Sequence, residues 1–314
     1  MSMLRAHVLP RWGSVPVTAV RRGDVVTWVG QLVQDGCKPD VVRRAVATLR
    51  MTLTGAMDGG MLTVNPAAAI PLPRPPRHNV RPLTVAQVEA LAAAIEHPAL
   101  RVGGNGASVG RRERPDLALA VRLAAYTGLR AGELWALRRR DLDSACRTLR
   151  VRESLAEVGG HLVFGATKTG VIRAVTWPAS LDDAISRHMS TRPPDPDALV
   201  FASGSGAPTR HRAFSARHFR PALAAAGLPP TTRWHDLRHT HASLLIAMGA
   251  HPKAIQERLG HSSITVTLGT YGHLFPGVGD ELAQGLDALI VTTRGHGEGT
   301  QITTAPSSEP KNAI

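Results

Sequence analysis

The chain has 314 residues, enough for two ordinary domains, and 43% of them are hydrophobic, which is enough to form buried cores. Its formal net charge of +13 favours a polyanionic partner, most often nucleic acid. The apolar runs are too short to span a membrane, no secretory signal opens the chain, and Cys37 and Cys146 lack metal-ligand spacing, so we expect a cytoplasmic protein with free thiols.

Residues 1–68 are expected to form a small helical domain. Apolar residues recur at helical spacing in "GDVVTWVGQLVQD" (23–35) and in "KPDVVRRAVATLRMTLTGAMDGG" (38–60), and glycines end both stretches. Residues 69–82 continue a proline-rich, basic stretch without an apolar period, which predicts a stiff linker.

A second domain is predicted over residues 83–290. It opens on a helix that Thr84 and Gln87 mark with a capping-box pattern. Residues 102–115 predict a mobile loop; their G-x-G follows no strand and is a weak nucleotide-binding signal. A strongly helical stretch then breaks at Gly128.

Short β-like pieces follow this helical stretch. They are "RTLRVRES" (147–154), "HLVFGAT" (161–167) and "IRAVTWP" (172–178), and Gly-containing turns separate them. Helical patterns resume at Pro178, and residues 291–314 are polar and predicted to be disordered. The expected fold is therefore mainly α with a small β-sheet, in the α+β class.

Four short segments of the second domain carry candidate functional residues. They are "TGLRAGEL" with Arg130, "ATKTGVIRAV" with Lys168, "WHDLRHTHASLL" with His235 and Arg238, and "LGHSSITVTLGTYGHL" with His261 and Tyr271. Taken singly, each has a structural explanation: an ion pair for either arginine, a solvated turn for Lys168, or packing for Tyr271. Order, spacing and residue type together match one pattern.

That pattern resembles the tyrosine recombinase family, also called phage integrases, and the resemblance covers most of the chain. The first domain is similar, less strongly, to the helical core-binding (SAM-like) DNA-binding domain of the family, through "HVLPRWG", the helix after "RRGD" and "NPA". The family's usual helix before "HVLP" is missing, so we expect an amino-terminal truncation. The resemblance implies a site-specific recombinase that cleaves and rejoins DNA through a 3′-phosphotyrosine intermediate, without metal or another cofactor.

The chemistry of a phosphodiester explains the two arginines and one histidine. Attack on phosphorus increases the negative charge on its non-bridging oxygens, and guanidinium groups in a partly dehydrated site stabilise that charge. Arg130 and Arg238 fit this role, and His261 matches the family position for a further donor. Glu133, three residues after Arg130, is expected to orient that arginine.

The roles of the nucleophile, the base and the general acid are assigned to three further residues. Tyr271 matches the nucleophile, and because a free phenol has a pKa of about 10, it needs a proton acceptor or cationic neighbours. His235 is the best candidate base. Lys168, at a flexible hairpin, fits the general acid that protonates the 5′-hydroxyl leaving group, a task to which arginine is unsuited.

The second domain also permits two other interpretations. His235, His239 and His241 offer metal-ligand chemistry, but His241 would point away from the other two and no carboxylate or cysteine completes a set. Residues 242–271 also resemble a helix-turn-helix, so a non-catalytic DNA-binding regulator, or a truncated inactive integrase, is the alternative function. Neither a metal site nor a regulator accounts for Arg130, Lys168 and Tyr271 together.

The expected partners follow from the resemblance. They are double-stranded DNA attachment sites, copies of the same chain in a tetrameric synapse, and, as candidates, accessory DNA-bending or directionality proteins; no membrane partner is expected. An apolar helical period after Tyr271, at Val278, Leu282, Leu286 and Leu289, suggests a helix that packs on a neighbouring subunit.

Overall fold

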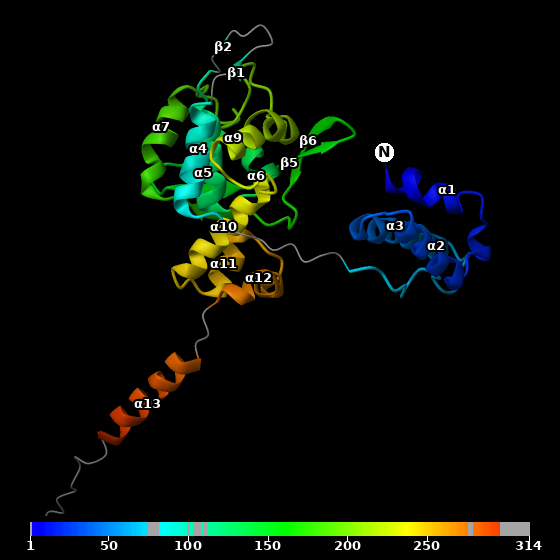
Figure 1. The fold of residues 1–314 in the computed structure, drawn as a ribbon. Helices are drawn as coiled ribbons and strands as arrows, with labels where there is room; N and C mark the ends of the chain where they lie inside the picture. Colours follow the sequence, from blue (N-terminus) through cyan, green and yellow to red (C-terminus); the bar gives the residue numbers. More distant parts are fainter. Residues whose placement is uncertain are drawn as a thin grey trace, which may run out of the picture. The chain divides into compact units, whose positions relative to one another are not determined.

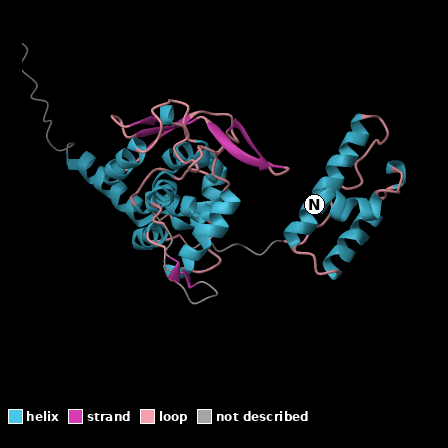
Figure 2. Cartoon of the chain, turned by 90° about the horizontal axis from the view of Figure 1, so that it is seen from above, coloured by secondary structure: helices cyan, strands magenta, loops and turns pink. Residues whose placement is uncertain are grey.

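The structure is a computed structural model that describes residues 2–74, 82–98, 101–102, 108–109, 112–275 and 279–295. It divides into two compact units, Met1–Asn79 and Val80–Ile314. Figure 1 shows the elements in chain order, and the mainly helical composition with a few strands in Figure 2 confirms the α+β prediction.

The first unit is a helical bundle. A π-helical turn, Leu4–Val8, leads into α1 (Leu9–Trp12), and the two longer helices are α2 (Arg22–Gln34) and α3 (Pro39–Asp58). Their apolar stripes face one another and form the core through Val25, Trp28, Val29, Leu32, Val42, Val46, Leu49 and Leu53.

The stretch that follows α3 packs on these helices. The Asn65 amide donates hydrogen bonds to the backbone oxygen of Arg50 and to the hydroxyl of Thr54, at 2.9 Å each. Ala67 and Ile70 are buried in the core of the bundle. The first part of the predicted linker is thus bound to the bundle, whereas residues 75–81 lie outside the described residues.

The second unit is built around α5 (Pro115–Thr127), which is buried along most of its length. The helices of this unit before α11 are α4 (Val85–Glu96), α5, α6 (Ala131–Ala136), α7 (Asp182–Ser190), α8 (His211–Phe214), α9 (Arg220–Ala225) and α10 (Trp234–Ala247). The capping box of α4 is confirmed, because the Thr84 hydroxyl accepts from the Gln87 backbone N–H at 3.2 Å and the Gln87 side chain accepts from Thr84 at 2.9 Å.

The strands form three small antiparallel sheets. One pairs β1 (Arg101–Val102) with β2 (Ser108–Val109); the rest of the loop predicted over 102–115 lies partly outside the described residues. The second has the order β3 (Leu142–Asp143), β4 (Thr148–Val151), β7 (Arg173–Thr176). The third is the hairpin of β5 (Glu153–Val158) and β6 (His161–Ala166), which projects from the body of the unit in Figure 1.

This pairing corrects one detail of the prediction for Lys168. Strand β6 pairs with β5, whereas β7 pairs with β4 in the register Thr148↔Thr176. Lys168 therefore lies in a connection between two sheets, not at the tip of a hairpin.

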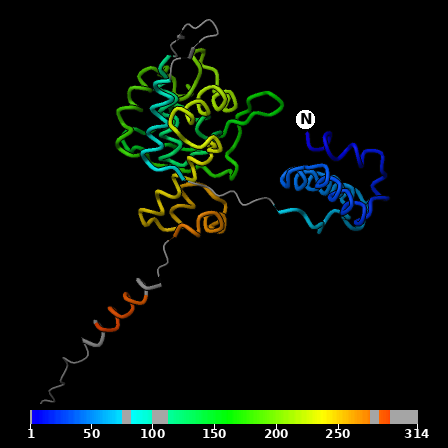
Figure 3. The backbone as a smooth tube through the Cα atoms, in the orientation of Figure 1, coloured from blue at the N-terminus to red at the C-terminus, as the bar shows by residue number. Residues whose placement is uncertain are grey.

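Beyond α10, the chain folds into α11 (Pro252–Leu259) and α12 (Ile264–Tyr271), as the trace in Figure 3 shows. Residues of α10, α11 and α12 make a second, smaller core of Ala242, Ile246, Ile255, Leu259 and Tyr271. The last helix, α13 (Gly279–Gly295), includes the first residues of the tail predicted to be disordered; residues 296–314 lie outside the described part. No helix in the described part is both long and apolar enough to cross a membrane.

Candidate active site

A glycine turn brings three helices together at the predicted site. Helix α5 ends at Gly128, which has a left-handed φ of 69°. A Cβ at this position would lie 2.6 Å from the His241 ring of α10 and 2.8 Å from the Leu259 side chain of α11. Only glycine allows both the backbone turn and this close approach.

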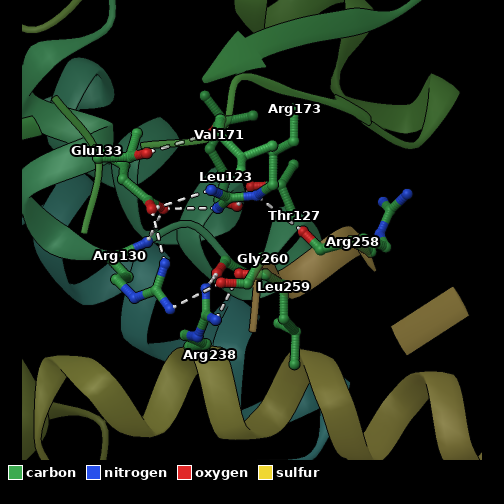
Figure 4. A network of polar contacts seen from close by, with 12 residues as sticks. Leu123, Thr127, Arg130, Glu133, Val171, Arg173, Arg238, Arg258, Leu259 and Gly260 are labelled. Carbon is green, nitrogen blue, oxygen red and sulfur yellow. Dashed lines mark hydrogen bonds and ion pairs between the residues drawn. The ribbon is translucent and has the colours of Figure 1, made fainter. Parts of the chain in front are cut away.

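Arg130 lies two residues after this turn, at the amino-terminal cap of α6. Its guanidinium donates from Nη1 to Glu133 Oε1 at 2.9 Å and from Nη2 to the backbone oxygen of Gly260 at 3.2 Å, as Figure 4 shows. Its backbone N–H donates to the other Glu133 oxygen at 2.8 Å. The side chain remains 24% exposed, so its guanidinium is held in place and still accessible to a ligand.

Arg238 projects from α10 toward the same place (Figure 4). It donates to the backbone oxygen of Gly128 at 2.7 Å and to that of Leu259 at 2.6 Å, and it is only 2% exposed. Burial, and next the charge of Arg130, lower the pKa of Arg238 to about 9, so the side chain is cationic at neutral pH.

Glu133 accepts from a third arginine that the sequence interpretation missed. Arg173, the first residue of β7, donates to Glu133 Oε1 at 3.0 Å and Oε2 at 2.7 Å. Glu133 is 1% exposed. Burial alone would raise the pKa of its carboxyl, but the hydrogen bonds and charges of Arg173 and Arg130 outweigh burial and lower the pKa to about 2.

A signal for Arg173 was present in the sequence. Residues alternate between buried and exposed along β7, and Arg173 shares the buried face with Val175. A charged residue on the inward face of a strand requires a buried partner, which here is Glu133.

His261 and His235 lie beside the two arginines that face the site. His261 follows the left-handed Gly260 at the end of α11, and its Nδ1 is 2.8 Å from the Thr267 hydroxyl oxygen. Burial, and then Arg238 and Arg130, lower the pKa of His261 to about 4, so it is a neutral donor at neutral pH. Partial removal of the ring from water, and then the charges of Arg238 and Arg130, also lower the pKa of His235, whose side chain still reaches solvent at the surface of α10.

Tyr271 ends α12 with its side chain turned into the small core. It is 3% exposed, and its hydroxyl lies 2.7 Å from Nδ1 of His239, not of His235. The His239 ring packs edge to face against the His235 ring, with 4.9 Å between the ring centroids. His239 was not a predicted site residue, although it lies one helical turn after His235.

Lys168 is the one predicted site residue for which the structure shows no contact with the described residues of this cluster. It is exposed in the connection between β6 and β7, and it makes no hydrogen bond or ion pair with another described residue. Two apolar residues of the same connection, Val171 and Ile172, are also exposed.

The cluster has the properties of an anion site. A guanidinium has five N–H donors, and Arg130 and Arg238 each use two of them on the described residues named above. The remaining donors, with the two histidines, can bind the oxygens of a phosphate group.

A metal site has no comparable support. Among the residues that the structure describes, no His, Cys, Asp and Glu side chains gather in a group of three or more that could hold an ion. His239 contacts Tyr271, whereas His241 accepts a hydrogen bond from Arg258 Nε at 2.8 Å.

Known proteins with similar sequences include integrases. The model of the phage integrase family matches residues 82–277. The putative prophage phiRv2 integrase of Mycobacterium tuberculosis is 31% identical over 297 residues, which cover 91% of this chain and 72% of the relative.

Solved structures also resemble the chain in fold. The Tn1549 transposon integrase in complex with transposon right end DNA has a TM-score of 0.72 at 24% identity and covers 92% of this chain and 91% of its own. A lambda integrase tetramer bound to a Holliday junction has a TM-score of 0.52 at 22% identity, over 79% of this chain and 66% of its own.

Proposed function

We propose, from the premise that the chain belongs to the phage integrase family of tyrosine site-specific recombinases, that Tyr271 is the residue through which it cleaves and rejoins DNA. The phenol oxygen attacks the scissile phosphorus, a 3′-phosphotyrosine bond forms, and the 5′-oxygen of the next nucleotide leaves. A 5′-hydroxyl of the partner duplex reverses the step, so no external energy source is needed.

Arg130 and Arg238 are proposed to bind the non-bridging oxygens of the reacting phosphate. Both guanidiniums are fixed before DNA arrives, because backbone oxygens and Glu133 hold them. Donors that need no reorganisation stabilise the charge that develops in the transition state. His261, neutral at neutral pH, adds a hydrogen bond to the same oxygens.

Tyr271 has to leave its pocket before it can react. Its hydroxyl is buried against His239, and burial raises the pKa of the phenol to about 12. Release of the end of α12 would expose the phenol to Arg238, whose charge already lowers its pKa. We propose that DNA binding favours this release.

Two proton-transfer roles are part of the proposal. His235 is the candidate base from the sequence, and His239, which contacts the phenol directly, is a second candidate. Lys168 is the candidate general acid, and we propose that its connection approaches the leaving 5′-oxygen when DNA is bound, because no hydrogen bond fixes Lys168 to another described residue.

The proposal extends to partners. Duplex DNA and a tetrameric synapse fit the family and the net charge of +13. The first unit is proposed to be the core-binding domain that binds DNA, and α13 is proposed to pack on a neighbouring subunit. A cytoplasmic location accords with this role.

The observation that carries the proposal is that Arg130, Arg238, His261 and Tyr271, from three separate segments of the sequence, lie around the ends of α5, α11 and α12. The test is covalent trapping on a nicked suicide attachment-site substrate without added metal. Tyr271→Phe should abolish the covalent adduct and leave DNA binding nearly unchanged. The matched control is Tyr126→Phe, at the only other tyrosine in the sequence; an adduct that persists in Tyr271→Phe overturns the assignment.

A further inference from the structure

Three consecutive backbone oxygens at the end of α11 each bind a different arginine. Arg173 Nε donates to the oxygen of Arg258 at 3.1 Å. Arg238 donates to the oxygen of Leu259 at 2.6 Å, and Arg130 to the oxygen of Gly260 at 3.2 Å. Figure 4 shows the three guanidiniums arranged around this short segment. The position of the segment therefore sets the positions of all three side chains.

Arg173 differs from the other two because its donors are directed to the protein. All three of its guanidinium nitrogens donate hydrogen bonds, one to Arg258 and two to Glu133. Its side chain is 8% exposed, compared with 24% for Arg130. Arg238 is also buried, at 2%, but only two of its three guanidinium nitrogens donate to described residues. Arg173 is therefore placed to support other groups, not to bind DNA.

Through Glu133, Arg173 acts on Arg130. The same carboxylate oxygen, Oε1, accepts from Arg173 at 3.0 Å and from Arg130 at 2.9 Å. The carboxylate would otherwise be a buried anion with one partly exposed partner, a costly arrangement. Arg173 thus keeps Glu133 ionised and oriented, and Glu133 fixes Arg130.

Through the end of α11, Arg173 acts on Arg238. A Cβ added to Gly260 would lie 3.0 to 3.2 Å from the Arg173 guanidinium, so that group is packed against the Gly260 backbone. The hydrogen bond to Arg258 and this packing hold the carbonyls that bind Arg238 and Arg130. Because Arg173 also begins β7, it anchors the connection that carries Lys168.

We propose that Arg173 is a positioning residue that sets the geometry of both phosphate-binding arginines, one through Glu133 and the other through the backbone at the end of α11. It does not contact the substrate. This inference rests on the function proposed above, in which Arg130 and Arg238 meet the charge on the scissile phosphate.

The test compares Arg173→Met with wild type on two suicide substrates, one with a normal scissile phosphodiester and one with a methylphosphonate at that position. The methylphosphonate carries no negative charge before attack, so its reaction depends less on a pair of aligned guanidiniums. Adduct formation by Arg173→Met should fall by about 100-fold on the phosphodiester, in the range seen when one oxyanion donor is removed. On the methylphosphonate the loss should shrink to about tenfold or less.

The matched control is Arg150→Met. Arg150 lies on the neighbouring strand β4, opposite Ala174 in the register, and is exposed. It should retain wild-type rates on both substrates. Arg173→Lys, which keeps the charge but cannot serve Glu133 and Arg258 together, should give a smaller loss with the same dependence on substrate, and it provides a second variant if Arg173→Met does not fold.

A double-mutant cycle with Glu133→Gln tests the route through the carboxylate. If Arg173 acts partly through Glu133, the two losses should be clearly less than additive. Equal losses on both substrates, or fully additive losses, would overturn the inference while wild-type adduct formation still supports the function. Failure of wild type itself to form an adduct would instead overturn the proposed function, and the inference with it.

Discussion

Nδ1 of His239 lies 2.7 Å from the hydroxyl oxygen of Tyr271, and the pKa values of the two side chains are shifted in opposite directions. Burial raises the pKa of the phenol to about 12, and burial, followed by the charge of His235, lowers the pKa of His239 to about 4. At neutral pH a protonated phenol therefore meets a neutral imidazole. The free protein therefore holds the phenol that we propose as the nucleophile in an unreactive form.

This relationship can be measured by ultraviolet titration of a Tyr126→Phe variant, in which Tyr271 is the only tyrosine left. At about pH 10.5, where an exposed phenol is more than half ionised, Tyr271 should remain almost fully protonated. Bound attachment-site DNA should lower its apparent pKa as the side chain approaches Arg238. A phenol that titrates near 10 in the folded, DNA-free protein would contradict burial of the hydroxyl.

Lys168→Ala is expected to slow DNA cleavage, because the 5′-oxygen leaves poorly without a proton. We expect a loss of about 100-fold or more, as for other general acids. A substrate with a 5′-bridging sulfur, whose thiolate leaves without protonation, should restore the rate. Lys253→Ala, which removes an exposed lysine paired with Gln256 and Glu257 on α11, is the matched control. Equal loss on both substrates would refute the general-acid role.

Gly128→Ala should destabilise the protein by about 2–4 kcal/mol. About 1 kcal/mol comes from a left-handed alanine and about 1–3 kcal/mol from overpacking against His241 and Leu259. Gly227→Ala is the matched control, since Gly227 has a similar φ of 64° but no atom within 4 Å of an added Cβ. It should lose only the backbone part, about 1 kcal/mol, and similar unfolding midpoints for the two variants in urea would argue against the close packing.

Acid should remove the stabilisation that Glu133 provides. Its pKa falls from 4.5 to about 2 on folding, so the contribution is complete above 4.5 and is lost as the pH falls toward 2. It amounts to on the order of 3 kcal/mol at neutral pH and roughly half of that near pH 3. Urea unfolding of wild type and Glu133→Gln should therefore show a difference in free energy that shrinks between pH 7 and pH 3. A difference independent of pH would contradict the depressed pKa.

Residue identity and spacing were enough to predict several local features of the fold. The capping box at Thr84, the turn at Gly128 and the strands after residue 147 all have local causes, and the structure contains them. The membership of Arg130 and Arg238 in one cluster could be expected from the resemblance, since no local pattern links residues 108 positions apart.

The features that could not be predicted from the sequence depend on contacts between remote segments. The pairing of β7 with β4, and not with β6, changes the setting of Lys168 and follows from long-range register. The choice of His239 over His235 as the partner of Tyr271 depends on how α12 packs against α10. Glu133 was expected to orient Arg130, but no local pattern could predict its second partner, Arg173, because that residue is 40 positions away in the sequence.

The arginines of the site are held largely by main-chain oxygens, those of residues 128, 258, 259 and 260. Every amino acid supplies the same carbonyl, so the residue at position 258 can change without removing the main-chain hydrogen bond from Arg173, although the side-chain bonds of Arg258 to His241 and Thr176 would be lost. Position 260 cannot, because its left-handed backbone and the guanidinium packed on it exclude a side chain. Divergent relatives can therefore keep the same main-chain acceptors for the arginines while sharing few of the residues that supply them. The glycines at positions 128 and 260 are the positions at which their sequences should be aligned.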